Sequence, residues 1–203
     1  MYAIVEDNNI IQFINNPKSV VIGDVRYPAK IFQLWTTAEK EAIGIYEIIV
    51  DKTNYKDPAY YNNTNSTYTF ANDKVTESWG TATPKRLEDE DAVDEDGENI
   101  LDDDGNQVIN YGLKTEKKRI VKQQASGLLE KTDWHNHKAL DDDTYTIPDN
   151  VKTYRANVRA KSNEMETQID ACTNVDELKA LYEYIRQEDG TITRPLAEFP
   201  KEI

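Results

Sequence analysis

The sequence DNVKTYRANVRAKSNEMETQIDAC, residues 149–172, decides how the second half of the chain folds. Proline at position 148, just before this stretch, suits the start of a helix. The pattern predicts one long amphipathic helix, because the apolar positions recur with the spacing of a single helical face. Its apolar stripe is only about one face wide, so the stripe must cover another element or another chain. The residues of the stripe are Val151, Tyr154, Val158, Met165, Ile169 and Cys172.

Helical patterns flank this stretch on both sides. Residues 113–131 carry scattered apolar positions among polar ones and predict a helix. On the other side, Asn174 is followed three residues later by Glu177, the spacing of a capping box. We expect a further helix from there to about Asp189-Gly190. Joined to the 149–172 helix through Thr173-Asn174, it would form an antiparallel hairpin or a bent rod.

The first 50 residues have the pattern of strands around one short helix. Apolar runs at 1–5 and 10–14 flank Asp7-Asn8-Asn9, which is favourable turn chemistry, and predict a β-hairpin. A third extended piece is expected at 19–22. Thr36 and Glu39 have capping-box spacing, so a helix is expected over 37–43. Gly44 then suits the left-handed residue that ends a helix, and 45–50 is expected to form a strand.

The segment from 51 to 82 is rich in Asn, Thr and Tyr, residues that suit turns and half-exposed sheet surfaces. Strand patterns at 66–71 and 74–79 flank Asn72-Asp73, a good two-residue hairpin turn. The whole chain contains 12 Tyr and 3 Trp. These side chains either pack the protein's own sheet or form protein–protein contacts, where Tyr and Trp are favoured.

The segment 88–104 carries eleven carboxylates and two similar units, each with an Asp-Gly step. We predict one or two protruding acidic β-turns or a flexible hinge. A calcium loop of the EF-hand type does not fit. With Gly97 or Gly105 at the sixth position, the first ligand position is occupied by Ala92 or Ile100. Weak binding of a divalent cation is the alternative to a solvated turn.

Composition narrows the classes of partner. The 203 residues include 24 Lys and Arg against 38 Asp and Glu, a formal net charge of −14. This balance argues against nucleic acid and anionic membranes as direct partners. No apolar run approaches the roughly 18 residues needed to cross a bilayer, and the N-terminus does not have the pattern of a signal peptide. The single cysteine, Cys172, is expected to be a small buried residue on a helix.

The common sequence motifs of catalytic and cofactor-binding sites do not occur in this sequence. It contains no phosphate-binding loop, dinucleotide fingerprint, nucleophile elbow or zinc-protease motif, so we expect no enzyme and no cofactor. The letters His-Asn-His at 135–137 are adjacent, unlike the separated residues of HNH nucleases. His135 and His137 would share one face of a strand and could form a weak metal site, although zinc prefers about four ligands. The alternative is a solvated surface loop.

Eight residues between 128 and 159 have a recognisable arrangement: a Leu pair, Thr-Asp-Trp, a short loop, then Tyr-Arg with a second Arg four residues later. They are Leu128, Leu129, Thr132, Asp133, Trp134, Tyr154, Arg155 and Arg159. This arrangement resembles the C-terminal signature of phage tail fibre assembly proteins. Residues 27–46 look like the N-terminal segment of phage virion or tail-region proteins. Unlike the family, this chain continues as predicted helix over 162–186 and lacks a Trp-x-Trp-Pro-like end.

The resemblance implies a protein of a tailed phage that acts through contacts with tail or tail-fibre proteins, in fibre assembly or attachment. It would be located in the virion tail, or in the host cytoplasm during assembly. A structural virion component is the alternative, a metal-dependent hydrolase or nuclease a lower one, and self-association is also open. We expect the motif to be architectural. Trp134 would cover the Leu pair, Thr132 or Asp133 would cap free amides, and Arg155 would pair with Asp133 or stack on Trp134.

Taken together, the patterns predict an α+β protein. A β-rich N-terminal domain is expected over 1–85 and an acidic turn or hinge insert over 86–112. A helical domain follows over 113–203, with the long amphipathic helix and a helical hairpin.

Overall fold

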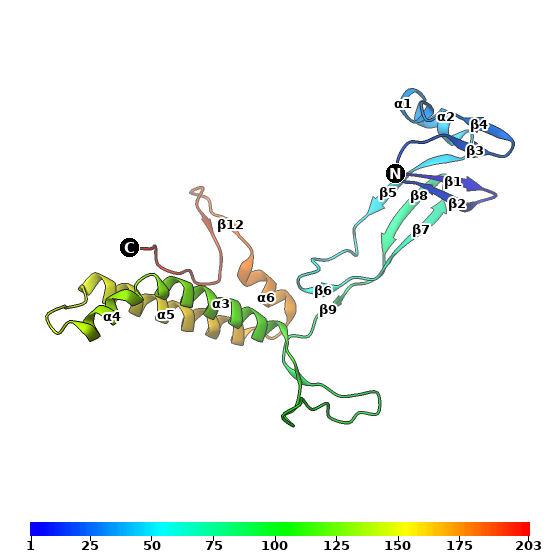
Figure 1. Ribbon diagram of the computed structural model, residues 1–203. Helices are drawn as coiled ribbons and strands as arrows, with labels where there is room; N and C mark the ends of the chain where they lie inside the picture. Colours follow the sequence, from blue (N-terminus) through cyan, green and yellow to red (C-terminus); the bar gives the residue numbers. More distant parts are fainter. The chain divides into compact units, whose positions relative to one another are not determined.

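The computed structural model describes all residues from Met1 to Ile203 and divides into two units, Met1–Thr83 and Pro84–Ile203. The first unit is rich in strands and the second is dominated by helices, so the predicted α+β class is confirmed (Figure 1). The boundary between the units falls between Thr83 and Pro84, and the acidic segment belongs to the second unit. Each unit has its own buried core and is described separately below.

A curled five-stranded sheet forms the framework of the first unit (Figure 1). The β5–β8 pair is parallel and the other three pairs are antiparallel. The rings of Phe13 and Tyr68, on the two outermost strands, have centroids 4.6 Å apart, so the sheet bends until its edges meet. The order across the sheet is β2 (Asn9–Ile14), β1 (Tyr2–Glu6), β5 (Ile45–Asp51), β8 (Lys74–Trp79) and β7 (Ser66–Ala71).

Turn chemistry explains both predicted hairpins of this sheet. Asp7-Asn8 and Asn72-Asp73 adopt positive φ angles between 47° and 63°, which two-residue hairpin turns require and Asn and Asp tolerate. Both hairpins are therefore confirmed, and β7 and β8 have the predicted bounds. The piece predicted at 19–22 is a strand that pairs with a neighbour missed from the sequence, as β3 (Val20–Ile22) with β4 (Val25–Tyr27). Further along, β6 (Tyr61–Asn62) pairs with β9 (Thr83–Pro84).

Two short helices, α1 (Ile31–Leu34) and α2 (Thr37–Glu41), connect β4 to β5. The predicted capping box is present in α2. The backbone amide of Thr36 donates to Glu39 Oε2 at 2.8 Å, and the amide of Glu39 donates to Thr36 Oγ1 at 3.3 Å. The helix expected over 37–43 ends two residues early. Helix α1 was not predicted, because its four residues are too few to show a helical period.

Strand β1 is buried on both faces and so contributes to two cores. Ala3 and Val5 pack with Ile48 and Val75 inside the curl of the sheet. Ile4 points the other way because successive side chains of a strand alternate. It joins the core beneath α1 and the β3–β4 hairpin, whose other buried members are Ile14, Val20, Ile31, Phe32 and Ile45.

Gly44 connects α2 to β5 under a tight constraint. Its φ is +82°, and a Cβ at this position would lie 2.6 Å from the carbonyl oxygen of Val5. The close approach is needed because the amide of Val5 donates to the Gly44 carbonyl at 2.8 Å. The predicted role of Gly44 as the residue that ends the helix is wrong, because α2 ends at Glu41 with Ala42 as its C-cap. Gly44 instead admits β1 beside the start of β5.

Gly44→Ala is expected to lower the free energy of unfolding of the first unit by about 2–3 kcal/mol, because it adds a left-handed alanine and a backbone clash. Gly23→Ala is the matched control. Gly23 also has a positive φ, +58°, but nothing lies within 4 Å of its Cβ position, so about 1 kcal/mol is expected. Urea unfolding followed through the amide NMR signals of residues 1–83 measures both. Equal losses would show that the contact with Val5 is unimportant.

An antiparallel pair of long helices forms the second unit (Figure 1). Lys118 near the start of one helix pairs with Asp170 near the end of the other at 2.7 Å, and Arg155 reaches the carbonyl of Leu129 at the opposite end. The pair consists of α3 (Leu113–Glu130) and α5 (Asp149–Ala171). It is accompanied by α4 (Asp133–Asp141) and α6 (Val175–Tyr182).

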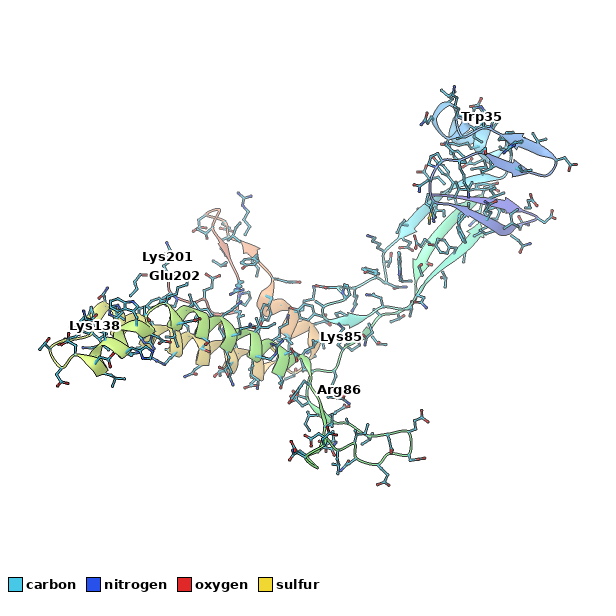
Figure 2. The ribbon with its side chains drawn as sticks, viewed as in Figure 1. Trp35, Lys85, Arg86, Lys138, Lys201 and Glu202 are labelled. Carbon is cyan, nitrogen blue, oxygen red and sulfur yellow. The ribbon has the colours of Figure 1, made fainter.

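The predicted apolar stripe of α5 is confirmed, since all six of its residues are buried. Elements of the same chain cover it. Tyr154 and Val158 pack against Ala125 of α3 and against Phe199 of the C-terminal segment. That segment is also held by Gln168, whose amide group bonds Pro195 and Ala197, and by an ion pair from Lys131 to Glu202. Figure 2 labels Glu202 beside the helices.

The predicted helix from Asn174 to about Asp189-Gly190 is wrong in its second half. Helix α6 ends at Tyr182, and the Asp-Gly step forms the turn of a hairpin between β12 (Ile185–Arg186) and β13 (Ile192–Thr193). Gly190 has a φ of +84° in this turn. The main helical partner of α5 is α3. The hairpin expected between α5 and α6 is therefore not the main helical pair, and α6 makes only a small contact with α5.

The acidic segment folds into two consecutive tight turns between β10 (Glu90–Asp91) and β11 (Ile109–Asn110). In each turn one carboxylate oxygen, from Asp94 or Asp102, accepts two backbone amides. The backbones of Ala92, Ile100 and Val108 close a ring of three hydrogen bonds at 2.8–2.9 Å. The predicted protruding turns are therefore confirmed, and hydrogen bonds within the segment define their geometry.

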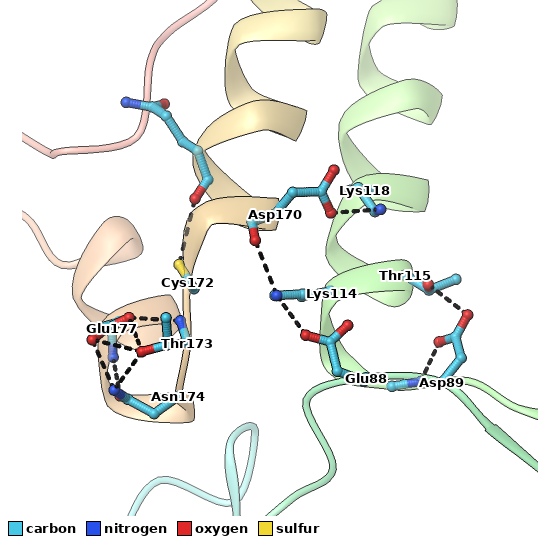
Figure 3. A network of polar contacts seen from close by, with 12 residues as sticks. Glu88, Asp89, Lys114, Thr115, Lys118, Asp170, Cys172, Thr173, Asn174 and Glu177 are labelled. Atoms are coloured by element: carbon cyan, nitrogen blue, oxygen red, sulfur yellow. Dashed lines mark hydrogen bonds and ion pairs between the residues drawn. The ribbon is translucent and has the colours of Figure 1, made fainter.

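Lys114 joins the base of the acidic segment to both long helices (Figure 3). It is only 8% exposed, and its Nζ donates to Glu88 Oε1 at 2.5 Å and to the Asp170 carbonyl at 3.0 Å. Asp89 accepts from the amide of Gly112 at 2.7 Å and from the hydroxyl of Thr115 at 2.9 Å. These bonds fix the start of α3 and the end of α5 at the same point.

The turn from α5 into α6 is held by Glu177 (Figure 3). Asn174 Oδ1 accepts the amide of Glu177 at 2.9 Å, as expected for a cap. The Glu177 carboxylate reaches the amide of Thr173 at 2.6 Å, one residue before the position of a standard capping box. Bonds from the Thr173 amide and then its hydroxyl lower the pKa of Glu177. Cys172 is buried beside this turn, as predicted, and burial raises the pKa of its thiol.

Glu177→Gln is expected to destabilise the second unit at neutral pH and to lose this effect in acid. The folded-state pKa of Glu177 lies below its ordinary 4.5. The carboxylate therefore stabilises the fold above pH 4.5, and that contribution disappears as the pH falls through the lower folded value. Unfolding curves of both proteins between pH 7 and pH 2.5 should converge at the acid end. A gap independent of pH would contradict the assignment.

Candidate functional site

The guanidinium of Arg155 is the centre of the predicted motif. Arg155 is 8% exposed, and its Nη1 donates to the Leu129 carbonyl at 2.8 Å and to Thr132 Oγ1 at 2.7 Å. Its Nη2 lies 2.8 Å from Asp133 Oδ1. The hydroxyl of Thr132 in turn donates to the Leu129 carbonyl at 2.9 Å. One side chain of α5 thus ties together the end of α3 and the start of α4.

This geometry decides between the contacts expected from the sequence. The Arg155–Asp133 ion pair is confirmed. The expected capping of free amides by Thr132 or Asp133 is wrong: Thr132 is the N-cap residue of α4 but makes no side-chain cap bond, because its hydroxyl is engaged by Leu129 and Arg155. The buried guanidinium acts at the other helix instead, where it donates to a carbonyl at the end of α3.

Apolar packing completes the junction. Tyr154 is 5% exposed and packs with Ala125 and Val158, and the half-buried Leu128 and Leu129 lie against the same cluster. Six of the eight motif residues therefore meet at one place, although α3 and α5 are separated by a turn, a helix and a loop. Those six are Leu128, Leu129, Thr132, Asp133, Tyr154 and Arg155.

Trp134 is not part of this packing, and its expected position over the Leu pair is wrong. It is 54% exposed and stacks on His135, with ring centroids 3.7 Å apart. The physical reason is that Thr-Asp-Trp does not form a turn. Asp133 starts helix α4, so the next side chain is directed away from the end of α3. Leu140, at the other end of α4, is 81% exposed.

The expected loop or strand around His135 and His137 is also corrected, since both residues lie in α4. Two positions apart on a helix, they do not share a face, so they cannot chelate an ion from one side. The Nδ1 of His135 is hydrogen-bonded to the hydroxyl of Tyr145 at 2.5 Å. No group of three or more His, Cys, Asp or Glu side chains in the structure is placed to hold a metal ion.

Arg159, the second arginine of the motif, lies outside the junction. It is exposed, and its Nη1 makes one long bond of 3.4 Å to the carbonyl of Arg155. With Lys152, Asn136 and Ile147 it lines a shallow recess of about 250 Å³ beside Arg155. The two arginines therefore differ: Arg155 has three protein partners, whereas Arg159 leaves most of its donors facing solvent.

Comparison with known proteins identifies no relative. No family model, no curated protein and no solved structure matches this chain. None of its helices combines the length and apolar character needed to span a membrane.

Replacing Arg155 by Ala is expected to lower the free energy of unfolding of the second unit by about 3 kcal/mol, because it removes the three polar contacts and the packing of a buried side chain that joins α3, α4 and α5. Arg155→Lys should recover only part of this loss, since an ammonium cannot reach all three acceptors at once. Arg159→Ala is the matched control on the next turn of α5 and should change stability by less than about 0.5 kcal/mol. Thermal unfolding followed by circular dichroism tests the set, and similar losses for Arg155→Ala and Arg159→Ala would contradict the assignment.

Proposed function

We propose that this chain is a non-enzymatic protein of the tail or tail-fibre apparatus of a tailed bacteriophage, which acts through protein–protein contacts in fibre assembly or attachment. The assignment to phage rests on the resemblance of the motif between Leu128 and Arg159 to tail fibre assembly proteins. The convergence of six motif residues at one junction supports the reading of that motif as architecture. The net charge of −14 favours polypeptide partners over nucleic acid.

The observation that carries a contact function is the exposure of two large apolar side chains on α4. Trp134 and Leu140 are 54% and 81% exposed, and both belong to a nine-residue helix whose start is fixed by Arg155. A helix this short with no buried residue has little reason to form by itself, so its anchored start is what holds it. Exposed Trp and Leu side chains on an ordered helix are typical of residues that become buried against a partner.

A permanent place in the virion is the second candidate. The acidic segment favours it, because its two turns are braced by their own backbone bonds and by Lys114 rather than left free. A part that is ordered before it meets its partner loses less conformational entropy on assembly. The protein would then be a stoichiometric tail, baseplate or adaptor component in the virion. As an assembly factor it would act in the host cytoplasm and leave.

Mass spectrometry of purified phage particles, with and without substitutions in α4, tests the proposal. For a virion component we expect stoichiometric amounts in the particle, and for an assembly factor we expect absence from the particle but co-purification with unassembled fibre subunits. In either case Trp134→Ala with Leu140→Ser should reduce fibre-bearing particles at least about tenfold, since hot-spot residues dominate such contacts.

Ile120→Ser with Tyr111→Ser is the control pair, because both side chains are exposed elsewhere in the same unit. Particles with normal fibres from the Trp134 and Leu140 variant would contradict a contact role for α4. Turnover of a nucleic acid or glycan, abolished by a single substitution, would contradict the non-enzymatic assignment.

A further inference from the structure

The shallow recess beside Arg155, of about 250 Å³, is cationic although the chain as a whole carries a net charge of −14. Lys152, Arg155 and Arg159 of α5 line it, together with Asn136 of α4 and Ile147 of the loop before α5. The three cations follow one another at steps of three and four residues, so they share one face of the helix. No carboxylate is among the lining residues.

Arg159 is the cation of this recess that has no counter-charge. Every other Lys and Arg of α3 and α5 forms an ion pair with a carboxylate or lies over an aromatic ring. Arg159 donates only one long bond, of 3.4 Å, to the carbonyl of Arg155. A guanidinium has five N–H donors in a planar fork. Most donors of Arg159 are therefore available for a planar acceptor such as a carboxylate, which an arginine binds through two parallel bonds.

The charges around the recess indicate which kind of anion it suits. Arg155 is paired with Asp133 at 2.8 Å, and Lys152 with Asp149 at 3.1 Å. Each of these pairs has no net charge, so Arg159 leaves one positive charge uncompensated. One monoanion, such as a carboxylate, neutralises that charge. A phosphate dianion would exceed it, and the negative net charge of the protein repels a dianion more strongly.

Asn136 and Ile147 supply the remaining contacts that a carboxylate side chain needs. The amide group of Asn136 is half-buried and forms no hydrogen bond within the protein, so it is free to donate to an acceptor in the recess. Its position is fixed because Arg155 anchors the start of α4 through Asp133. Ile147, also half-buried, offers an apolar surface to the methylene groups next to a carboxylate.

We propose that this recess binds one carboxylate of a partner polypeptide, with Arg159 making the bidentate contact and Lys152 and Asn136 completing it. The ion pair of Lys152 is no obstacle, because its partner Asp149 is 95% exposed and such surface pairs exchange at little cost. The recess is smaller than the roughly 300–1,000 Å³ of sites for whole small molecules, so it suits a single group rather than a nucleotide or a glycan. The inference rests on the proposed contact function, since it names a group that the partner must carry.

The test uses the full-length, isotope-labelled protein and three matched compounds. N-acetylglutamic acid α-amide carries a side-chain carboxylate, its isomer N-acetylglutamine carries a terminal one, and N-acetylglutamine amide is neutral. At constant ionic strength, the carboxylates should shift the Nε–H NMR signal of Arg159 with a dissociation constant on the order of 10 mM. The neutral compound should cause no shift. The tighter of the two isomers shows whether a side chain or a chain end is the better ligand.

Substitutions assign the binding to the recess. Arg159→Gln should weaken it at least about tenfold, followed through the backbone amide signals of residues 147–159. Arg159→Lys keeps the charge but cannot form two parallel bonds, so a loss of about threefold is expected. Both variants should fold, because Arg159 makes so few contacts within the protein. Lys161→Gln removes a cation from the same helix outside the recess and should leave the affinity unaltered.

Equal shifts with the neutral compound, with sodium chloride alone, or in Arg159→Gln would overturn the proposal. Binding of inorganic phosphate more than about tenfold tighter than that of either carboxylate would overturn the choice of ligand. The titration involves neither Trp134 nor Leu140 and needs no phage particle. Its failure would therefore remove the carboxylate site alone, whereas failure of the contact function would appear in the particles of the Trp134 and Leu140 variant.

Discussion

The packing of α5 against α3 is the interaction on which the helical unit depends. Hydrophobic residues make up only 38% of the chain, so the stripe on α5 is one of its few continuous apolar surfaces. A stripe one face wide defines which sides of two helices meet, but it specifies their relative sliding poorly. Polar groups at the two ends supply that register. Lys114 and Arg155, each 8% exposed, reach across to a carbonyl of the opposite helix at the start and at the end of α3, and each also meets a carboxylate outside the pair. A buried cation that finds several acceptors in only one alignment penalises every other alignment, because it would then be left unpaired.

Local sequence patterns predicted an element correctly wherever that element depends on residues close together in the chain. Strands β7 and β8, the Asn72-Asp73 turn and the capping box of α2 follow from residues within a few positions of one another. The prediction failed where one sequence pattern is compatible with two different structures. An Asp-Gly step ends a helix as readily as it turns a hairpin, and at Asp189-Gly190 the hairpin forms. Helix α4 was missed because it has no apolar stripe, and its start depends on Arg155, more than twenty residues away.

The contacts of the candidate site also divide into those that local sequence predicts and those that it does not. The ion pair between Arg155 and Asp133 could be predicted, since a Thr-Asp step after one helix and a Tyr-Arg step in the next suggest a clamp. The outward direction of Trp134 could not be predicted, because it depends on whether Thr132 and Asp133 form a turn or begin a helix. The pairing of β5 is further still from local sequence. The first half of the strand pairs with β1 and the second half with β8, and no short stretch of sequence encodes that change of partner.

The apolar stripe of α5 is not evidence for docking to another protein, because the chain itself covers it. A stripe that needs a partner is an argument for interaction only while no partner exists within the chain, and here α3 and the segment around Phe199 cover it. What remains uncovered has a different character. On α4 it is an aromatic and an aliphatic side chain on a short helix. A surface of this kind selects a partner by shape and apolar area. The proposed contact function therefore rests on α4 and not on the covered face of α5.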